Sequence, residues 1–487
     1  MIRSNYTVNV SPRFQVLSED QVAEMHHGSL EVLRRTGVKV LLAEARELLE
    51  KAGCWLDGEI VRFPPHLVEW ALRTAPSQIA ICDRRGRPAL ELAGYKTYFG
   101  TGSDCPFIID PYTGERRQPC FEDVVNFARL VDALPNIDFH MCMAIARDLD
   151  QSTVDIRHFE AMINNTTKPV CFTAWNLDNL KDIVEISEVV AGGAEALRRS
   201  PFAILYTEPV SPLKHIVEGT SKLMYMARKG LPVVYTPGMT FGAVAPVTSA
   251  GGLLVANAEL LSGLVIAQLA GEGMPFIYGG GVAIMDMRHM NVSYAAPEFM
   301  INMAALCDLA RYYQLPVFSF GGCADAKSFD EQASLEGALW ILTTALAGGN
   351  LSHDVGYIEY GLTASMEMTV MNDEIIGLVR RILGGIEVSV ETMALEVIDQ
   401  VGPDGNFLEQ DHTLRHFREN WYPTLLNRTS YAAWQQAGGL TYGARASAQV
   451  REILQGHRPE PLPEELRAAV QAIVRRATLR HGLGIGG

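Results

Sequence analysis

A short apolar run recurs eight times along the chain, and each run ends in small, polar or aromatic residues. The runs start about 30 to 43 residues apart, which leaves room for one loop and one helix between neighbours. Parallel strands need such a crossover, so the pattern predicts eight parallel strands. Eight βα units are typical of the α/β class and of a closed (β/α)8 TIM barrel, whose chemistry lies at the carboxyl ends of its strands. The predicted strands are 98–104, 137–143, 169–175, 202–208, 232–238, 275–281, 316–322 and 351–357.

Helical patterns flank the predicted barrel, which we place at residues 94–385. Residues 1–93 form a predicted N-terminal helical cap, with helices over 17–35, 42–51 and 64–75 and a hairpin around Asp57 and Gly58. Ser18 is the expected N-cap of the first helix. Residues 386–487 form a predicted C-terminal helical extension. It has an irregular segment over 386–427, helices over 431–437, 444–456 and 464–481, and a glycine-rich end that we expect to fray.

Composition narrows the classes of function. The net charge is −15, and an acidic chain without a stripe of Lys and Arg is a poor binder of nucleic acid. The start lacks the apolar core of a signal peptide, and the most apolar stretch, 251–270, contains Glu259 and is typical of a buried barrel helix. We therefore expect a cytoplasmic protein without a membrane span. The eight cysteines form no CxxC pair, so we expect neither disulfides nor a metal bound by the chain itself.

Aromatic and acidic residues gather where the predicted strands end. Aromatic faces carry negative potential and can replace the water around a quaternary ammonium, while carboxylates attract it from further away. The set therefore predicts a cation site, although aromatic side chains that only fill the barrel are the alternative. The candidate catalytic residues are Glu208, Asp104 and Asp354, and the candidate substrate-binding residues are Trp175, Tyr206, Phe241, His353, Tyr357 and Arg147.

Glycines crowd the same strand ends, and two explanations stay open. A large flat cofactor could approach the backbone closely there, or the glycines could serve the tight turns that every barrel needs. The glycine run at 279–281 is not followed by the GxGxxG spacing of a dinucleotide fold, which disfavours a Rossmann domain. The sequence also lacks HExxH and GxSxG, which disfavours a zinc protease and a serine hydrolase. The glycines that we assign to cofactor docking are Gly100, Gly102, Gly279, Gly280, Gly321 and Gly322.

Five segments resemble one known family, the trimethylamine methyltransferase superfamily, in its branch without pyrrolysine. They are LSEDQVAEMHHGSLEVLRRTGV, the stretch from YFGTGSDCPFII to LVDALPNID, AWNLDNLKDIVEI, the stretch from PGMTFGAVAPVTS to LSGLVIAQL, and GGCADAKSFDEQASLEGAL. The resemblance covers residues 17–453. It implies a (β/α)8 barrel that moves a methyl group from an amine to the cobalt of a separate corrinoid (cobalamin-type) protein, and the chain contains no pyrrolysine.

The resemblance implies a small quaternary amine as substrate, with glycine betaine as the first candidate. Proline betaine, carnitine or another trimethylammonium acid is the alternative within the same reaction. The corrinoid-binding DxHxxG pattern is absent, so the corrinoid is expected on a partner protein. Two other hypotheses stay open: a quaternary-amine binding protein without catalysis, and a metal-dependent enzyme that uses Cys142, Cys171 or Cys323. The long terminal arms favour pairing into a homo-oligomer.

Overall fold

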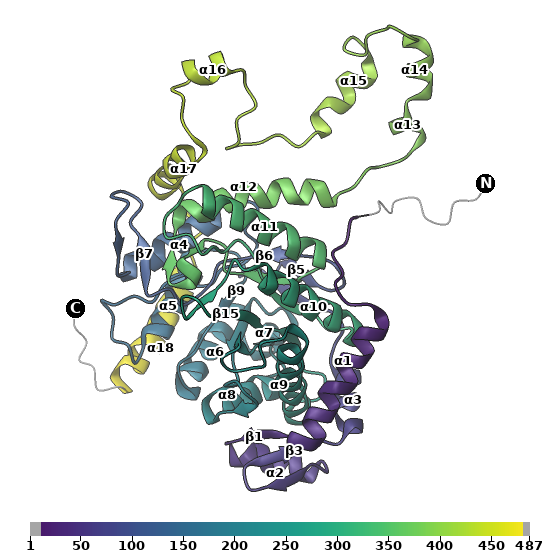
Figure 1. Cartoon of the computed structure of the whole chain (residues 1–487). Helices are drawn as coiled ribbons and strands as arrows, with labels where there is room; N and C mark the ends of the chain where they lie inside the picture. The colour runs from purple at the N-terminus through teal and green to yellow at the C-terminus, as the bar shows by residue number, and fades with distance from the viewer. Residues whose placement is uncertain (1–10, 481–487) are drawn as a thin grey trace.

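The core of the computed structural model, which describes residues 11–480, is a sheet of seven parallel strands surrounded by helices (Figure 1). Every pair of neighbours in the sheet is parallel, so seven of the eight predicted strands are confirmed. The strands, in spatial order, are β6 (Tyr98–Phe99), β18 (Leu351–His353), β17 (Val317–Phe320), β14 (Phe276–Gly279), β12 (Val233–Tyr235), β10 (Ala203–Thr207) and β9 (Val170–Phe172).

The eighth predicted strand, 137–143, is joined to the sheet by isolated bridges instead of a regular ladder. Phe139 bridges Gly100 beside β6, and His140 bridges Val170 in β9. The hydroxyl of Thr101 accepts a hydrogen bond from the backbone N–H of Met141 at 2.9 Å. A side chain there takes the place of the backbone carbonyl that a regular strand ladder would supply. The prediction of a fully closed eight-stranded barrel is therefore wrong at this segment, and the mixed α/β architecture is otherwise as expected.

Each strand contributes one or two apolar side chains to the interior of the sheet. A hairpin covers the end of the sheet at which the strands begin. The hairpin consists of β4 (Ile79–Cys82) and β5 (Pro88–Leu92). Its N–H groups at Cys82 and Arg84 bond to the carbonyls of Pro201 and Thr167, which precede β10 and β9. The interior cluster contains Ile79, Ile81, Leu90, Leu92, Phe139, Met141, Cys171, Ile204, Val234, Ile277, Phe318 and Leu351. The carboxyl end is thereby left for the site.

Eight long helices cover the sheet. The longest, α9, meets the length and hydropathy of a membrane span among the described residues, but 78% of its most apolar window is buried inside the protein, as predicted for a core helix. The helices are α4 (Phe121–Ala133), α5 (Val154–Asn165), α6 (Leu177–Ala191), α8 (Val217–Lys229), α9 (Ser249–Ala270), α10 (Pro297–Tyr313), α11 (Glu331–Ala347) and α12 (Met366–Leu383), with the short α7 (Ala194–Arg199) after α6.

Long loops after the strands form two small sheets above the carboxyl end. One contains β19 (Tyr357–Ile358), β20 (Thr363–Ala364), β7 (Phe107–Ile109) and β8 (Arg116–Arg117). The other contains β13 (Gly238–Phe241), β15 (Gly281–Asp286) and β16 (Asn291–Ser293). Because these sheets fix the loops against one another, they give the strand-end residues defined positions.

The N-terminal segment has the predicted helices and hairpin, together with a strand that the sequence analysis missed. Ser18 caps the first helix in a reciprocal capping box with Gln21. The missed strand, β1 (Val38–Val40), pairs with β11 (Lys214–His215) and so ties this segment to the barrel. The other elements are α1 (Glu19–Glu31), a π-helical turn (Val32–Thr36), α2 (Ala43–Lys51), β2 (Trp55–Asp57), β3 (Ile60–Arg62) and α3 (Pro65–Thr74).

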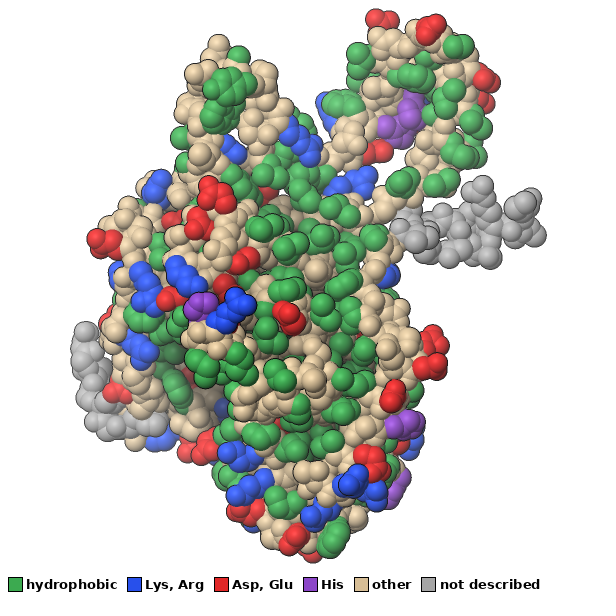
Figure 2. All heavy atoms as spheres, viewed as in Figure 1, with side chains coloured by type: hydrophobic (Ala, Val, Ile, Leu, Met, Phe, Trp, Pro, Cys, Tyr) green, Lys and Arg blue, Asp and Glu red, His purple; other side chains and the backbone are tan. Residues whose placement is uncertain are grey.

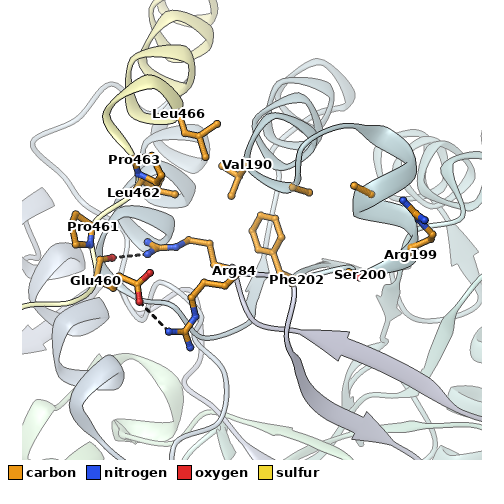
Figure 3. Close-up of a pocket in the computed structure, with 14 residues that line it drawn as sticks. Arg84, Val190, Arg199, Ser200, Phe202, Glu460, Pro461, Leu462, Pro463 and Leu466 are labelled. Carbon is orange, nitrogen blue, oxygen red and sulfur yellow. Dashed lines mark hydrogen bonds and ion pairs between the residues drawn. The ribbon is translucent and has the colours of Figure 1, made fainter.

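The C-terminal region returns to the barrel through two helices. Helix α17 (Tyr442–Gly456) packs on α12 and α4, and α18 (Glu464–Arg480) packs on α6 and α5. Before α18, a cavity of about 380 Å³ lies beside the hairpin end, lined in part by Arg84, Arg199 and Glu460 (Figure 3). The buried Arg84 donates to the carbonyl of Glu460 at 2.5 Å, and Arg85 pairs with the Glu460 carboxylate at 3.0 Å. These contacts hold the Pro-rich segment 457–463, which connects α17 to α18.

Residues 386–420, which we call the C-terminal arm, stand away from the body at the top of Figure 1. The sequence analysis expected an irregular segment here, and the structure corrects this. The arm contains α13 (Val390–Met393), α14 (Leu395–Val401), α15 (Asp411–His416) and a 3-10 turn (Phe417–Glu419). Helix α16 (Tyr431–Gln436) follows as predicted. The glycine-rich end lies outside the described residues, and the boundaries at 93/94 and 385/386 stay predictions.

Candidate functional site

A cavity with two lobes lies at the carboxyl end of the sheet. The inner lobe is about 270 Å³ and the outer lobe about 540 Å³, and both are lined by Ser103, Asp104, Tyr206 and Glu208. Loops after different strands therefore meet at one place, as expected for this architecture. Of the nine predicted catalytic and substrate-binding residues, seven line the cavity. They are Asp104, Tyr206, Glu208, His353, Asp354 and Tyr357 in the inner lobe and Trp175 in the outer lobe.

Glu208 lines both lobes, and its carboxylate is hydrogen-bonded to an aromatic hydroxyl. The Tyr206 hydroxyl, in β10, donates a hydrogen bond to Oε1 of Glu208, which directly follows that strand. Burial raises the pKa of Glu208 to about 7, and the charge of Asp104 adds to the effect, while Tyr206, His353 and Lys222 oppose it. A cation entering the cavity would favour the ionised form, so the carboxyl is poised to gain its charge when a cationic ligand binds.

Asp104 lies deep in the molecule, yet its side chain is open to the cavity. Burial raises the pKa of this carboxyl, and the charge of Asp354 raises it further, while a hydrogen bond from Ser103 and the charge of His353 lower it. The backbone N–H of Asp104 donates to the Tyr357 hydroxyl at 2.9 Å. The loop after β6 and strand β19 are thus locked together at the cavity wall.

His353 is a buried ring with unused polar capacity. It stacks on Phe318 with ring centroids 4.3 Å apart and lies at the same distance from Phe320. Its Nδ1 is 2.6 Å from Oδ1 of Asp354, but neither ring nitrogen has a hydrogen bond of good geometry within residues 11–480. Buried polar atoms without partners are uncommon and mark a place where a ligand atom can bind. Asp354 itself has a left-handed φ of 71°, which holds its side chain beside this ring.

Aromatic rings surround these carboxylates. Tyr206, Tyr357, Phe320 and Tyr294 line the inner lobe, and Tyr294 packs edge-on against Phe320 with centroids 5.9 Å apart. Trp175 stands at the outer lobe with 54% of its surface exposed, and its backbone N–H donates to Asp155 at 2.8 Å. Rings and carboxylates around one space are the arrangement that recognises organic cations in proteins.

Two predicted substrate residues lie elsewhere. Phe241 is fully buried at the end of β13, where its ring lies against Gly252, so it packs below a helix instead of lining the cavity. Arg147 is exposed on the surface and does not line either lobe. In both cases the apolar run ended at the expected position, but the loop that follows turned the side chain away.

The six glycines assigned to cofactor docking all face atoms of the chain itself. A Cβ on Gly102 would lie 2.2 Å from Cζ of Tyr357 and 2.4 Å from Oδ1 of Asp354. Gly279 has a φ of 125°, and its Cβ would lie 2.2 Å from the carbonyl oxygen of Phe318. Packing within the strand ends gives these glycines a structural reason, and their assignment to cofactor docking stays a prediction. The remaining four, Gly100, Gly280, Gly321 and Gly322, are similarly in contact with Phe139, Pro237, Phe99 and Asn372.

The sequence analysis missed the groups that helices contribute to the cavity. Lys222 of α8 lines the outer lobe and donates to the carbonyl of Ala174 at 2.6 Å, and burial lowers the pKa of its ammonium. Asp155 and His158 of α5 line the same lobe. These residues stand inside helices, so a search of strand ends could not find them. The available signal in the sequence was Lys222 itself, a charged residue beside the apolar residues of the helix at 217–229.

The cysteines do not gather into a metal site. Cys142 lines the outer lobe, while Cys171 and Cys323 are fully buried. Burial raises the pKa of all three thiols. Across residues 11–480, the one group of three side chains that could hold a metal ion is Glu391, His412 and His416, in the C-terminal arm. The hypothesis of a cysteine-dependent metalloenzyme therefore has no support.

Comparison with known proteins identifies relatives over the whole length. The chain is 34% identical over 469 residues to trimethylamine methyltransferase MttB of Desulfitobacterium hafniense (strain DSM 10664 / DCB-2), covering 96% of this chain and 94% of that protein. It is 31% identical over 468 residues to glycine betaine methyltransferase of Desulfitobacterium hafniense (strain Y51), covering 95% and 97%.

A solved structure shares the fold. The monomethylamine methyltransferase MtmB of Methanosarcina barkeri matches with a TM-score of 0.50 at 12% identity, covering 91% of this chain and 89% of that one. The sequence model described as trimethylamine methyltransferase (MTTB) matches residues 2–482. The resemblance seen in the sequence is therefore confirmed, and the chain belongs to the trimethylamine methyltransferase family.

Proposed function

We propose that this protein transfers a methyl group from a quaternary amine to the cobalt of a corrinoid carried by a separate protein. One observation carries the proposal: Glu208, Asp104 and the rings around them form a cavity suited to an organic cation. A glycine betaine methyltransferase at 31% identity supports a quaternary amine as the class of substrate. The chain contains no pyrrolysine, which argues against the route used by the pyrrolysine enzymes of the family.

The reaction requires little acid–base catalysis by the protein. A quaternary ammonium already carries its charge and leaves as a neutral tertiary amine, so no proton has to move. The corrinoid supplies the nucleophile that takes the methyl group. The chain's own residues then have to bind the cation, hold one N–CH3 bond toward the opening and keep water away. Glu208 and Asp104 attract the charge, while Tyr206, Tyr357 and Phe320 enclose the methyl groups.

The opening of the outer lobe suits a partner that arrives from outside. Trp175 and Val210 line this lobe with 54% and 37% of their surfaces exposed. Exposed apolar side chains at a cavity mouth are a common feature of surfaces that another molecule covers. We expect these two residues to face the corrinoid protein.

Glycine betaine is the first candidate substrate because the inner lobe is small, about 270 Å³. Its carboxylate needs a basic or hydrogen-bonding partner. Since Arg147 lies on the surface, His353 and Lys222 take that role in this proposal. The adjoining outer lobe would accommodate the longer chain of carnitine or the ring of proline betaine, which keeps those substrates as alternatives.

The test is methyl transfer to free Co(I) cobalamin, followed as the spectral change to methyl-Co(III), with glycine betaine, proline betaine, carnitine and trimethylamine in parallel. Transfer from glycine betaine but not from trimethylamine is the expected result. Transfer from a bulkier betaine would keep the reaction and change the substrate. Calorimetry that detects binding of a betaine, without transfer even to a cognate corrinoid protein, would favour the non-catalytic binding protein.

A further inference from the structure

The C-terminal arm has helices but no core of its own. None of the residues of α13, α14 or α15, all of which the structure describes, is buried. Several apolar side chains there face solvent, including Val390 at 83% and Leu408 at 81% exposure, and Figure 2 shows the hydrophobic surface of this projection. Short helices are marginal in water without tertiary packing. Some other contact must therefore hold α13 and α15 together.

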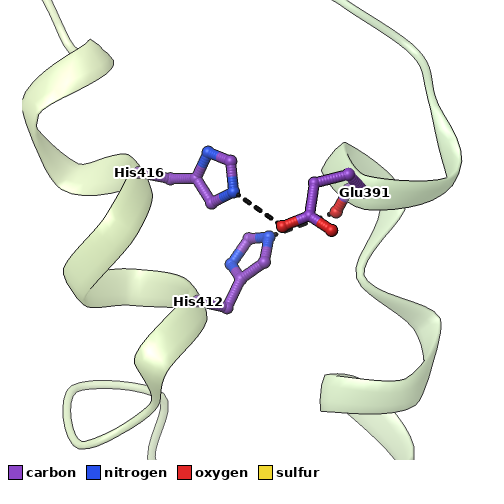
Figure 4. A group of neighbouring side chains, drawn as sticks. All are labelled: Glu391, His412 and His416. Carbon is purple, nitrogen blue, oxygen red and sulfur yellow. Dashed lines mark hydrogen bonds and ion pairs between the residues drawn. The ribbon is translucent and has the colours of Figure 1, made fainter.

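Three metal-ligating side chains meet between these two helices. His412 and His416 stand one turn apart on α15 and point toward Glu391 of α13 (Figure 4). The ligand atoms of the three residues all lie within 4.8 Å of one another, and the two imidazole rings have centroids 4.3 Å apart. Histidines at i and i+4 present their nitrogens on one face of a helix, which is the spacing that metal sites use.

A fourth side chain orients one of the ligands. Nδ1 of His416 lies 2.7 Å from Oε1 of Glu419, while Nε2 of the same ring faces Glu391 at 3.2 Å. Metal-bound histidines commonly donate their other ring N–H to a carboxylate, which fixes the tautomer and makes the ligating nitrogen more basic. Glu419 stands where such a partner is needed.

The same atoms also form ion pairs, so the competing explanation is a cluster of exposed ion pairs without a metal ion. Nη1 of Arg415 lies 2.7 Å from Oε1 of Glu391, on an exposed surface. Exposed ion pairs contribute little to stability, so they hold a coreless arm weakly. Arg415 is expected to compete with a bound metal ion for this oxygen and thus to lower its affinity.

We propose that Glu391, His412 and His416 bind one divalent transition-metal ion of the zinc class, which clips α13 to α15. Two imidazoles and one carboxylate suit Zn²⁺, and water completes the fourth position. The ion would take the place of a hydrophobic core in fixing the arm, as metals do in other small folded units. This site is separate from the cavity, because none of its residues lines either lobe.

The first test is zinc titration of the full chain, with any affinity tag removed, against a chromophoric chelator. We expect one Zn²⁺ per chain, and at least a 100-fold weaker affinity in the double variant H412Q/H416Q. H289Q is the matched control, because His289 is also exposed and pairs with one carboxylate, Asp286, at 2.7 Å. Glu419→Gln should weaken binding by about 10-fold, and Arg415→Gln should strengthen it. Equal zinc affinity in the wild type and H412Q/H416Q would overturn the proposal.

The second test asks whether the ion clips the arm. Limited proteolysis with and without Zn²⁺ should show slower cleavage within residues 386–420 in the wild type and in H289Q, and no change in H412Q/H416Q. Circular dichroism of each variant controls for global folding. Zinc binding that leaves cleavage of the arm unchanged would refute the clip. Both readouts are independent of methyl transfer, so failure of the proposed enzymatic function would leave them interpretable.

Discussion

The cavity and the C-terminal arm both bring histidine and carboxylate together, but they do so by different means. In the cavity, His353 ends β18 and Glu208 directly follows β10, so the two residues, 145 positions apart in sequence, are placed by a packed sheet. In the arm, His412 and His416 share one helix of six residues, and nothing there is buried. His353 has one carboxylate, Asp354, at 2.6 Å but no hydrogen bond of good geometry, whereas His416 has two carboxylates within 3.2 Å. A rigid scaffold can hold polar groups unsatisfied for a ligand, and an exposed helix cannot.

The largest expected difference between these regions is in stability. Leu264 of α9 is fully buried, so Leu264→Ala should lower the free energy of unfolding by about 2–5 kcal/mol. Leu408 of the arm is 81% exposed, and Leu408→Ala should change it by less than about 0.5 kcal/mol. Urea unfolding followed by circular dichroism measures both. A loss of more than about 2 kcal/mol in Leu408→Ala would show that the arm is packed in solution.

Removing one charge from the cavity should have the next largest effect. In Glu208→Gln the side chain keeps its size and can still accept a hydrogen bond from Tyr206, but it no longer attracts a cation. We expect kcat/KM for the quaternary amine to fall about 100-fold, which corresponds to about 2.7 kcal/mol. Glu218→Gln is the control, because Glu218 is exposed at the outer lobe. Equal losses in both variants would argue for a general effect of charge instead of a cation site.

The barrel could be predicted from the sequence because buried parallel strands are continuous apolar runs at regular intervals. The run at 137–143 shows the limit of this rule: it is as apolar as the others, yet the Thr101 hydroxyl takes one of its ladder bonds. The arm shows the opposite limit. Apolar residues recur at helical spacing at Val390, Met393, Ile398 and Val401, but the three helices have only 4, 7 and 6 residues and bury nothing, so the segment reads as irregular.

The part of the site that could be predicted from the sequence consists of residues at strand ends. Asp104, Glu208 and His353 stand at strand ends and therefore converge. Phe241 and Arg147 also follow apolar runs, but Phe241 lies in β13 of a small outer sheet and Arg147 in a surface loop. The direction of such side chains depends on contacts distant in sequence, which no local pattern encodes. Lys222 was missed because it reaches the cavity from inside a helix, where a search of strand ends does not look.

A methyl group added at one glycine tests whether the cavity wall is as tightly packed as the core. In Gly102→Ala the new Cβ would lie within 2.4 Å of Tyr357 and Asp354, so both side chains must move. Overpacking of this kind costs about 1–3 kcal/mol of stability, and we expect kcat to fall roughly 10-fold as the wall shifts. Gly456→Ala is the control, because a Cβ there meets nothing within 4 Å. Urea unfolding and single-turnover methyl transfer report the two effects, and unchanged kinetics would contradict a rigid wall.

The pH dependence of cation recognition tests the same carboxylate without any substitution. Burial raises the pKa of Glu208 to about 7, so the free protein carries the charged form mainly above that pH. For a cationic substrate, kcat/KM should rise by up to 10-fold per pH unit below about pH 7 and level off above it. Since the pKa in the folded protein exceeds that in the unfolded chain, this group alone makes the ligand-free protein less stable as pH rises from about 4.5 to 7.

A quaternary ammonium makes this measurement unusually direct, because its charge does not change with pH. A tertiary amine would titrate itself and mix its own protonation with that of the protein. With glycine betaine, any rise in kcat/KM between pH 6 and pH 8 therefore comes from the protein or the corrinoid partner, and the Glu208→Gln variant separates the two. We expect the rise to disappear in Glu208→Gln and to persist in Glu218→Gln. A profile that is flat in the wild type would mean that Glu208 is already ionised at pH 6, and that the rings, more than the carboxylate, recognise the cation.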